Sequence, residues 1–184
     1  IRPTPTRHLI RPPEANDTVA AWQDAVAHDG PTALILSRQG IEVVTDGSAV
    51  EFGAGIVRDA ERPRIVLVAT GSEVPVCVAA AEQLATDGVA ARVVSMPSWD
   101  RFDRQDPVYR HDVFPPDVPV LAVEAGVSLG WHRYADDVVG INRFGASAPG
   151  GVALDRLGIN PDHVVVHAHD LIAGTTSEHE RSSS

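Results

Sequence analysis

The chain has 184 residues, 43% of them hydrophobic, which is enough to bury one core and part of a second. Its formal net charge of −10 disfavours nucleic acid and anionic membranes as partners, because phosphate surfaces attract clustered Lys and Arg. The single cysteine, Cys77, excludes an internal disulfide and a metal site built from several cysteines. No apolar run approaches the roughly 20 residues that span a bilayer, and no signal-peptide pattern opens the chain, so we expect a cytoplasmic protein.

The first third of the chain has the pattern strand, helix, strand. A short apolar strand is expected over residues 7–10 and ends at Pro12-Pro13, because proline cannot continue a central ladder. The next apolar residues recur at helical spacing and predict one face of an amphipathic helix: Ala15, Val19, Trp22 and Val26. The opposite, polar face carries Asp17, Asp24 and His28. After Gly30-Pro31, the unbroken run at residues 32–36 is typical of a strand covered on both faces.

Between residues 40 and 62 the pattern weakens into glycines, charges and isolated valines, which is typical of a linker with room for one short strand. We therefore expect a domain boundary here. Residues 1–61 form a first unit with its linker, and residues 62–175 form a second domain. Residues 176–184 are polar and are expected to form a disordered tail.

The second unit begins with the strongest strand pattern of the chain, the apolar run at residues 64–70. A helix to about Asp87 and a strand at residues 90–95 follow, and together they predict a βαβ unit with parallel strands. Another apolar strand is expected at residues 118–124, and a last helix at residues 162–172. The fold class is therefore α/β: a small, mainly parallel sheet flanked by helices, preceded by a separate βαβ unit.

Two places could bind an anion. Gly71-Ser72-Glu73 stands between a buried strand and a helix, where free backbone N–H groups could hold a phosphate, although a capped helix start is the simpler interpretation. Arg38 follows the carboxyl end of a parallel strand, where open α/β sheets bind ligands, and its planar guanidinium suits phosphate. A plain surface arginine is the alternative interpretation of Arg38.

Other reactive side chains give weaker signals. His163 and His167 are four apart on the last helix but lack a third ligand in register, so the sequence assigns no metal site. Cys77 lies on the apolar face of a helix, which is typical of a buried thiol. Glu124 ends a buried strand, where it could be a base or could serve an interface or a cap. The residues alone name no catalytic group.

Six ordered motifs resemble the transketolase family, and together they cover nearly the whole chain. They are Ile10-Arg11-Pro12 with Val19-Ala20-Ala21-Trp22; Ser37-Arg38-Gln39; Val68-Ala69-Thr70-Gly71-Ser72-Glu73-Val74; Val93-Val94-Ser95-Met96-Pro97-Ser98-Trp99; Val123-Glu124-Ala125-Gly126; and Arg143-Phe144-Gly145-Ala146-Ser147-Ala148-Pro149-Gly150. The last of these is the most specific to the family.

The resemblance implies an enzyme of the pentose phosphate pathway that transfers a two-carbon ketol unit between sugar phosphates, as a homodimer with thiamine diphosphate and Mg²⁺. It identifies residues 1–61 as the end of a pyrimidine-binding domain with its linker, and residues 62–175 as the transketolase C-terminal domain. Arg38 then matches the arginine that binds the phosphate of the substrate. The residues that hold the metal and the cofactor are expected upstream, so we expect this chain alone to contain no catalytic residue, to bind no cofactor and to be inactive.

Alternatives to an excised part of a transketolase remain open. The chain begins with Ile1 rather than Met, which favours a piece of something longer, but a processed amino terminus would look the same. A separately encoded C-terminal subunit is the second hypothesis, belonging to a split transketolase or to a related enzyme such as a deoxyxylulose phosphate synthase or a ketoacid dehydrogenase β subunit. A non-catalytic module that binds a phosphate or nucleotide is the third.

Overall fold

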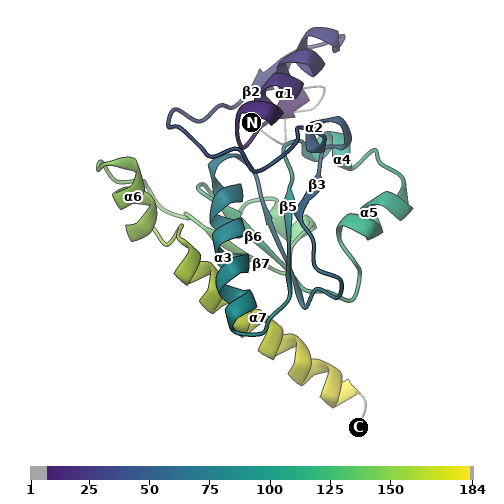
Figure 1. Cartoon of the computed structure of the whole chain (residues 1–184), viewed down its shortest axis with the longest axis vertical. Helices are drawn as coiled ribbons and strands as arrows, with labels where there is room; N and C mark the ends of the chain where they lie inside the picture. The colour runs from purple at the N-terminus through teal and green to yellow at the C-terminus, as the bar shows by residue number, and fades with distance from the viewer. Residues whose placement is uncertain (1–7, 183–184) are drawn as a thin grey trace.

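The computed structural model describes residues 8–182, with side chains as far as residue 175. Arg7, at the start of the first expected strand, and residues 183–184 of the expected tail lie outside the described residues. The described residues contain two sheets: a two-stranded sheet near the amino terminus and a five-stranded sheet of order β3-β5-β4-β6-β7 (Figure 1).

The small sheet pairs β1 (His8–Ile10) with β2 (Thr32–Leu34) in parallel, and α1 (Ala15–Ala27) connects the two strands. This is the βαβ unit that the sequence predicts. The helix begins at Glu14, whose side chain accepts hydrogen bonds from the N–H groups of Asn16 and Asp17 and so caps the first turn. We call residues 8–36 the β1–β2 unit.

The two faces of α1 are the reverse of the expected arrangement. Val19, Trp22 and Val26 are 59%, 56% and 82% exposed, whereas Asp17 is fully buried. The periodicity correctly groups the residues of each face, but partners from neighbouring segments meet the polar face and nothing described covers the apolar one. The strand β2 is also only half-buried, and was expected to be covered on both faces.

In the five-stranded sheet, β4 (Ile65–Ala69) lies between β5 (Ala91–Ser95) and β6 (Val120–Glu124) and runs parallel to both. All three strands are buried along their whole length, which confirms the prediction from their near-continuous apolar character. The strand β7 (Asp137–Gly140) extends the sheet parallel to β6, and β3 (Gly55–Arg58) closes the other edge antiparallel to β5.

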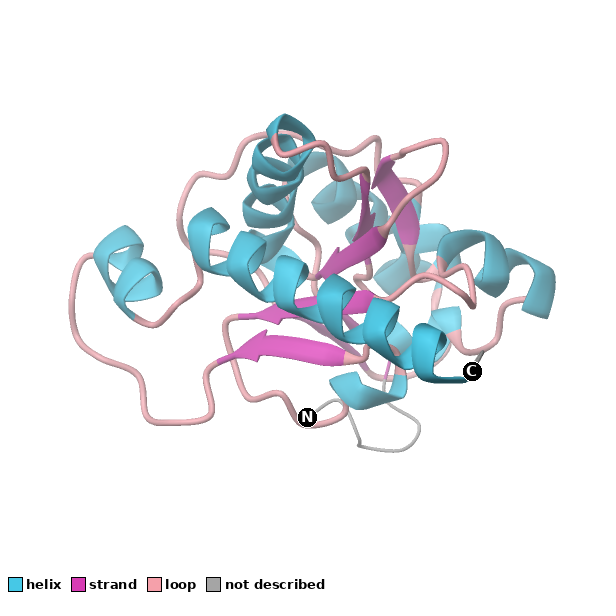
Figure 2. Cartoon of the chain, turned by 90° about the horizontal axis from the view of Figure 1, so that it is seen from below, coloured by secondary structure: helices cyan, strands magenta, loops and turns pink. Residues whose placement is uncertain are grey.

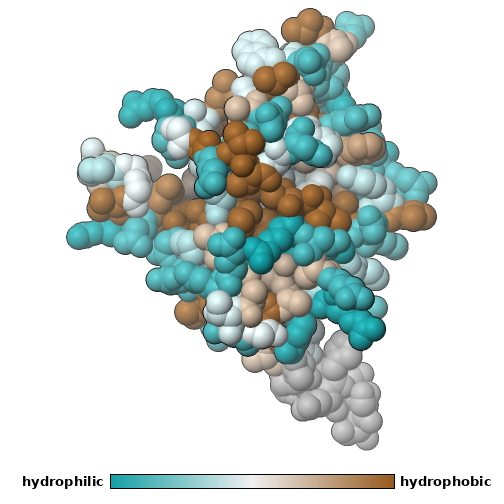
Figure 3. Space-filling view, viewed as in Figure 1, coloured by the Kyte–Doolittle hydropathy of each residue, from teal (hydrophilic) through white to brown (hydrophobic). Residues whose placement is uncertain are grey.

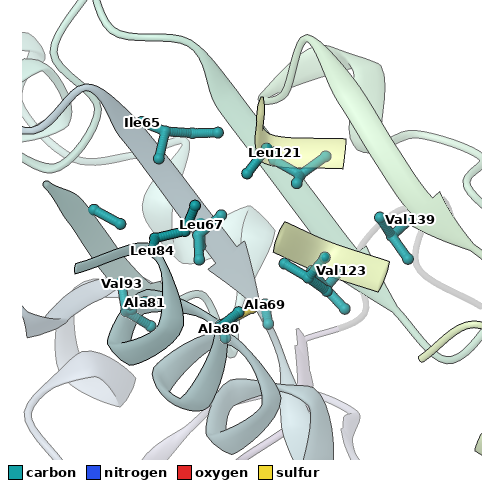
Figure 4. Close-up of a cluster of buried hydrophobic side chains, with 14 of the residues drawn as sticks. Ile65, Leu67, Ala69, Ala80, Ala81, Leu84, Val93, Leu121, Val123 and Val139 are labelled. Carbon is teal, nitrogen blue, oxygen red and sulfur yellow. The ribbon is translucent and has the colours of Figure 1, made fainter. Parts of the chain in front are cut away.

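One face of this sheet packs against two helices, α3 (Val74–Thr86) and α7 (Pro161–Ser182). Because side chains alternate along a strand, Ile65 and Leu67 point to this face and pack with Leu84 of α3 (Figure 4). Figure 2 shows α7 lying along the sheet beside this core. Cys77 of α3 is fully buried here, and burial raises the pKa of its thiol, as expected for a structural cysteine.

The opposite face carries a second core under short helical segments. Val66 and Val68 of β4 point to this side, where Met96, Phe102 and Trp131 belong to the same core. The segments that cover this face are α4 (Trp99–Phe102), α5 (Pro107–Val113) and η2 (Trp131–Arg133). The five-stranded sheet is therefore the middle layer of a three-layer α/β domain.

Some boundaries differ from those expected. Both α2 (Ala49–Phe52) and β3 lie in the segment expected to be a linker, and β3 is part of the large sheet, so that sheet takes in residues before the predicted boundary at residue 61. Helix α7 continues to Ser182, although a disordered tail was expected from residue 176. The short α6 (Gly150–Arg156) lies apart from the sheet in Figure 1. No helix within residues 8–182 is long and apolar enough to cross a membrane.

Candidate functional site

Arg38 lies in the loop that follows β2, just past the carboxyl end of a parallel strand, as the sequence predicts. The N–H of Ile35 donates to the carbonyl of Ile10 at 2.9 Å, so the pairing with β1 continues to within three residues of Arg38. The Arg38 side chain is exposed, and none of the ion pairs among the described side chains includes it. Its guanidinium is therefore available to a ligand.

The start of α3 has a different environment from the one that an anion site needs. Gly71 begins the short η1 (Gly71–Glu73), and its N–H donates to the carbonyl of Arg11 at 3.2 Å instead of facing solvent. Gly71 has a φ of +63°, and a Cβ added there would lie 2.6 Å from Nε of Arg11, so only glycine fits. The buried Glu73 side chain adds a carboxylate at the same place. This geometry argues against anion binding by Gly71, Ser72 and Glu73.

Arg11 is the centre of a buried ion-pair cluster at this helix start. Its Nη1 donates to the carbonyl of Thr70 at 3.0 Å and to Oε1 of Glu124 at 2.9 Å, and its Nη2 donates to Oε1 of Glu73 at 2.9 Å. The backbone N–H of Ala125 also donates to Glu73, at 2.9 Å. Burial raises the pKa of the Glu73 carboxyl, and the nearby Arg11 opposes that rise.

The Arg11 cluster occupies the carboxyl ends of β4 and β6. From β4 the chain goes to β5 on one side and later returns to β6 on the other, so this is the point where the strand order reverses and where open α/β sheets bind ligands. Here a side chain from the β1–β2 unit fills that place. Through its contact with Arg11, Glu124 joins the two units, and it also accepts a hydrogen bond from Trp131 Nε1 at 2.9 Å. Of the two roles that the sequence offers for Glu124, these contacts favour the interface over the base.

A second polar cluster, which the sequence did not suggest, surrounds His8 of β1. Its ring nitrogens contact Asp24 of α1 at 2.6 Å and Asp100 of α4 at 2.9 Å. Both clusters join residues far apart in sequence, so no local pattern marks them. The one available signal for Arg11 was an arginine at the very end of a strand, directly before Pro12-Pro13.

The remaining histidine candidates do not form a metal site. His163 and His167 stack with ring centroids 4.7 Å apart, but His163 contacts the carbonyl of Gly158 and His167 contacts Asp137. Within the described part of the chain, no group of three or more His, Cys, Asp or Glu side chains could hold a metal ion.

Comparison with known proteins decides the family. Residues 53–160 match the family model for the transketolase-like TK C-terminal domain. The chain belongs to the transketolase family. It is 44% identical to the transketolase of Geobacillus stearothermophilus and 41% identical to transketolase 1 of Escherichia coli K12, and each alignment covers 94% of this chain and 28% of the relative. The chain thus spans little more than a quarter of the length of the curated relatives that it matches.

Solved transketolase structures have the same fold over nearly the whole chain. The transketolase from Leishmania mexicana matches with a TM-score of 0.91 and 41% identity, over 95% of this chain and 26% of that one. The transketolase of Pichia stipitis in complex with sedoheptulose 7-phosphate matches with a TM-score of 0.92 and 32% identity, over 96% of this chain and 26% of that one. A split-gene transketolase described as an inactive β4 tetramer has a TM-score of 0.78 over 94% of this chain and 60% of that one, and at 24% identity it is similar in fold alone.

In this chain, the polar residues described above thus divide into two kinds. Arg38 is exposed and has no described partner, so it can meet a ligand. Arg11 and His8 are held by carboxylates inside the protein, at the two ends of β1, the strand that pairs with the strand before Arg38. The buried groups can act on a ligand only through the position of that strand pair.

Proposed function

We propose that the complete protein is a transketolase that transfers a two-carbon ketol unit between sugar phosphates in the pentose phosphate pathway. We propose further that Arg38 binds the phosphate of the sugar. The observation that supports the role of Arg38 is its exposed guanidinium just past the carboxyl end of β2, which has no ion-pair partner among the described side chains. The structural relative from Pichia stipitis, whose complex contains sedoheptulose 7-phosphate, supports the class of substrate.

The role of Arg38 is binding and orientation. A guanidinium can donate two parallel hydrogen bonds to a phosphate, which a point charge such as Lys cannot reproduce. The phosphate end of the sugar is remote from the reacting carbon, so this contact has the same strength in the ground state and in the transition state. We therefore expect Arg38 to affect KM much more than kcat.

We assign no step of the reaction to a cofactor held by this chain. In the complete enzyme, thiamine diphosphate with Mg²⁺ would supply the carbanion chemistry. The described residues do not fit the metal ion, because no cluster of three or more metal-ligating side chains is present among them. We propose that the cofactor and the metal are held by the rest of the enzyme, and that this chain alone is inactive.

We also propose that the β1–β2 unit is covered by the rest of the enzyme or by a partner subunit. The large hydrophobic side chains on the apolar face of α1 are exposed together, which is unusual, and Ile35 and Leu36 after β2 are exposed as well. Figure 3 shows further hydrophobic side chains gathered across the middle of the face seen there. A homodimer in the cytoplasm, with this chain either continuous with the other domains or separately encoded, would provide such a cover.

The test is a comparison of two donors with the complete enzyme carrying Arg38→Ala. We expect kcat/KM for xylulose 5-phosphate with a ribose 5-phosphate acceptor to fall about 10- to 100-fold, since a hydrogen-bonded charge pair contributes roughly 1.5–3 kcal/mol. Activity with hydroxypyruvate, a donor without a phosphate, should change little when a non-phosphorylated aldehyde serves as acceptor. Arg38→Lys is the matched variant and should recover part of the loss. An equal fall with both pairs of substrates would mean that Arg38 supports the fold and does not bind the phosphate.

A further inference from the structure

His8 lies between two carboxylates in the interior of the protein. Its side chain is only 1% exposed, and Nε2 contacts Oδ2 of Asp24 at 2.6 Å while Nδ1 contacts Oδ2 of Asp100 at 2.9 Å. A carboxylate oxygen accepts hydrogen bonds, so both ring nitrogens can be satisfied together only if both carry a proton. The hydrogen bond to Asp100 is the main cause that raises the pKa of His8, and burial opposes the rise.

Among the described residues, the charged and titratable groups that contact His8 or its partners come from two neighbouring segments. Asp24 comes from α1 and His28 directly follows this helix, with its ring centroid 5.0 Å from that of His8. From α4 and the turn after it come Asp100, Arg101 and Arg104. Arg101 pairs with Asp24, and Arg104 pairs with Asp100 at 3.2 Å. Each carboxylate is thus shared between an arginine and His8, and loss of the His8 proton leaves a ring nitrogen lone pair facing a carboxylate oxygen.

These contacts connect the two units of the molecule. Asp24 belongs to α1, in the β1–β2 unit, and Asp100 belongs to α4, on the large sheet. His8 itself is paired in register with Thr32 of β2, at the start of the strand that leads to Arg38. The position of Arg38 relative to the large sheet therefore depends on how firmly β1 is held, and His8 holds it from one end while Arg11 holds it from the other.

We propose that His8 is a positioning residue whose protonated ring clamps the β1–β2 pair, and with it Arg38, against the C-terminal domain, and that the clamp loosens when the ring loses its proton. The clamp itself is independent of the function proposed above. Its effect on substrate binding rests on the proposed role of Arg38. The clamp should be closed below pH 6.5, the ordinary pKa of histidine, and should open as the pH rises through the higher pKa that His8 has in the folded protein.

The first experiment measures the clamp in the 184-residue chain. Proton NMR of the histidine rings gives the titration of His8, and amide hydrogen exchange, corrected for the intrinsic effect of pH, reports opening of β1 and β2. We expect His8 to titrate above 6.5 and the exchange of β1 and β2 to accelerate over the same pH range. In His8→Gln this acceleration should vanish, and in the matched control His111→Gln, an exposed histidine of α5, it should persist. An unaltered chain whose β1–β2 protection does not change across the His8 titration would overturn the proposal.

Asp100→Asn provides a second test of the clamp that does not depend on whether His8→Gln folds. It keeps a hydrogen-bond acceptor beside the ring but removes the charge, so the His8 titration and the opening of β1 and β2 should both move to lower pH. If only one of the two moves, the proposal is wrong.

The second experiment uses the complete enzyme and follows KM for xylulose 5-phosphate between pH 6 and pH 9. We expect His8→Gln to raise KM at pH 6.5 by about 2- to 30-fold, the usual range for a residue that acts through another, and to flatten the increase of KM with pH. The hydroxypyruvate reaction should be unaffected. An unchanged profile of KM against pH contradicts the positioning role. If the clamp opens with pH but Arg38→Ala lowers activity equally with phosphorylated and non-phosphorylated substrates, the function assigned to Arg38 fails and the clamp stands.

Discussion

The β1–β2 unit and the five-stranded domain are stabilised in different ways. The five-stranded domain has two large hydrophobic cores, one on each face of its sheet. The β1–β2 unit shares a core whose buried members are only Ile10, Ala21 and Val50 among the described residues, and it exposes the apolar face of α1. Charged contacts centred on Arg11 and His8 attach it to the larger domain. Burial of apolar surface holds one region together, whereas a few polar clusters fix the position of the other.

The largest expected effect comes from breaking the Arg11 cluster. Arg11→Met should lower the free energy of unfolding of the chain by about 3–5 kcal/mol, because it leaves the Glu73 and Glu124 carboxylates buried without their cation. Urea denaturation measures this change, with Arg62→Met, which removes an exposed arginine, as the control. A loss no larger than that of the control would show that the cluster does not join the two units.

Truncation of one apolar side chain in each region compares how much apolar burial contributes to the stability of the two regions. Leu67→Ala should cost about 2–5 kcal/mol, because Leu67 is fully buried between the sheet and α3. Trp22→Ala should change the stability of the chain by less than about 0.5 kcal/mol, although it removes a larger side chain, because Trp22 is 56% exposed. Thermal and urea unfolding of both variants test this contrast. A cost above about 2 kcal/mol for Trp22→Ala would mean that the apolar face of α1 is covered within this chain.

A smaller effect is expected from Asp17, the buried acid of α1. Burial raises the pKa of Asp17 to about 7, and among the described residues its Oδ1 has no hydrogen-bond partner. Because the folded chain holds this proton more tightly than the unfolded chain, the free energy of unfolding should fall as the pH rises from about 4 to about 7, and stay at the lower value above that range.

Asp17→Asn removes this titration and should stabilise the chain by roughly 1–3 kcal/mol at pH 8, while gaining little at pH 4. The measurement is urea denaturation at several pH values, with the exposed Asp29→Asn as the control. Neither variant changes His8, so its contribution to the pH dependence of stability stays in both. That contribution is present below pH 6.5 and is lost as the pH rises through the raised pKa of His8. If Asp17→Asn loses stability between pH 5 and pH 7 as steeply as the unaltered chain, Asp17 does not carry this proton.

The same contrast explains which features could be predicted from the sequence. Strands β4, β5 and β6 are largely apolar runs, and such runs need cover on both faces, so their type and parallel direction followed from pattern alone. The faces of α1 could not be assigned, because periodicity groups residues by face without saying which face another part of the chain covers. Arg38 was placed correctly after its strand, and its role stays a prediction.

The polar clusters were missed for a different reason. Arg11 meets partners 62 and 113 positions away, and His8 meets Asp100 92 positions away. The specificity of such contacts comes from the tertiary arrangement, and a lone arginine or histidine near the start of the chain has no local spacing that reveals it. The partner of the helix start at Gly71 could not be foreseen for the same reason, since the group that fills it arrives from the β1–β2 unit.

Hydrogen exchange of the 184-residue chain compared with the complete enzyme tests most directly whether the two regions differ as described. The account predicts that amides of β1, α1 and β2 exchange much faster in the chain alone and become strongly protected in the complete enzyme, where the apolar face of α1 is covered. Amides of β4, β5 and β6 should be equally protected in both, since their cores lie within this chain. Equal protection of β1, α1 and β2 in the two proteins would contradict the account.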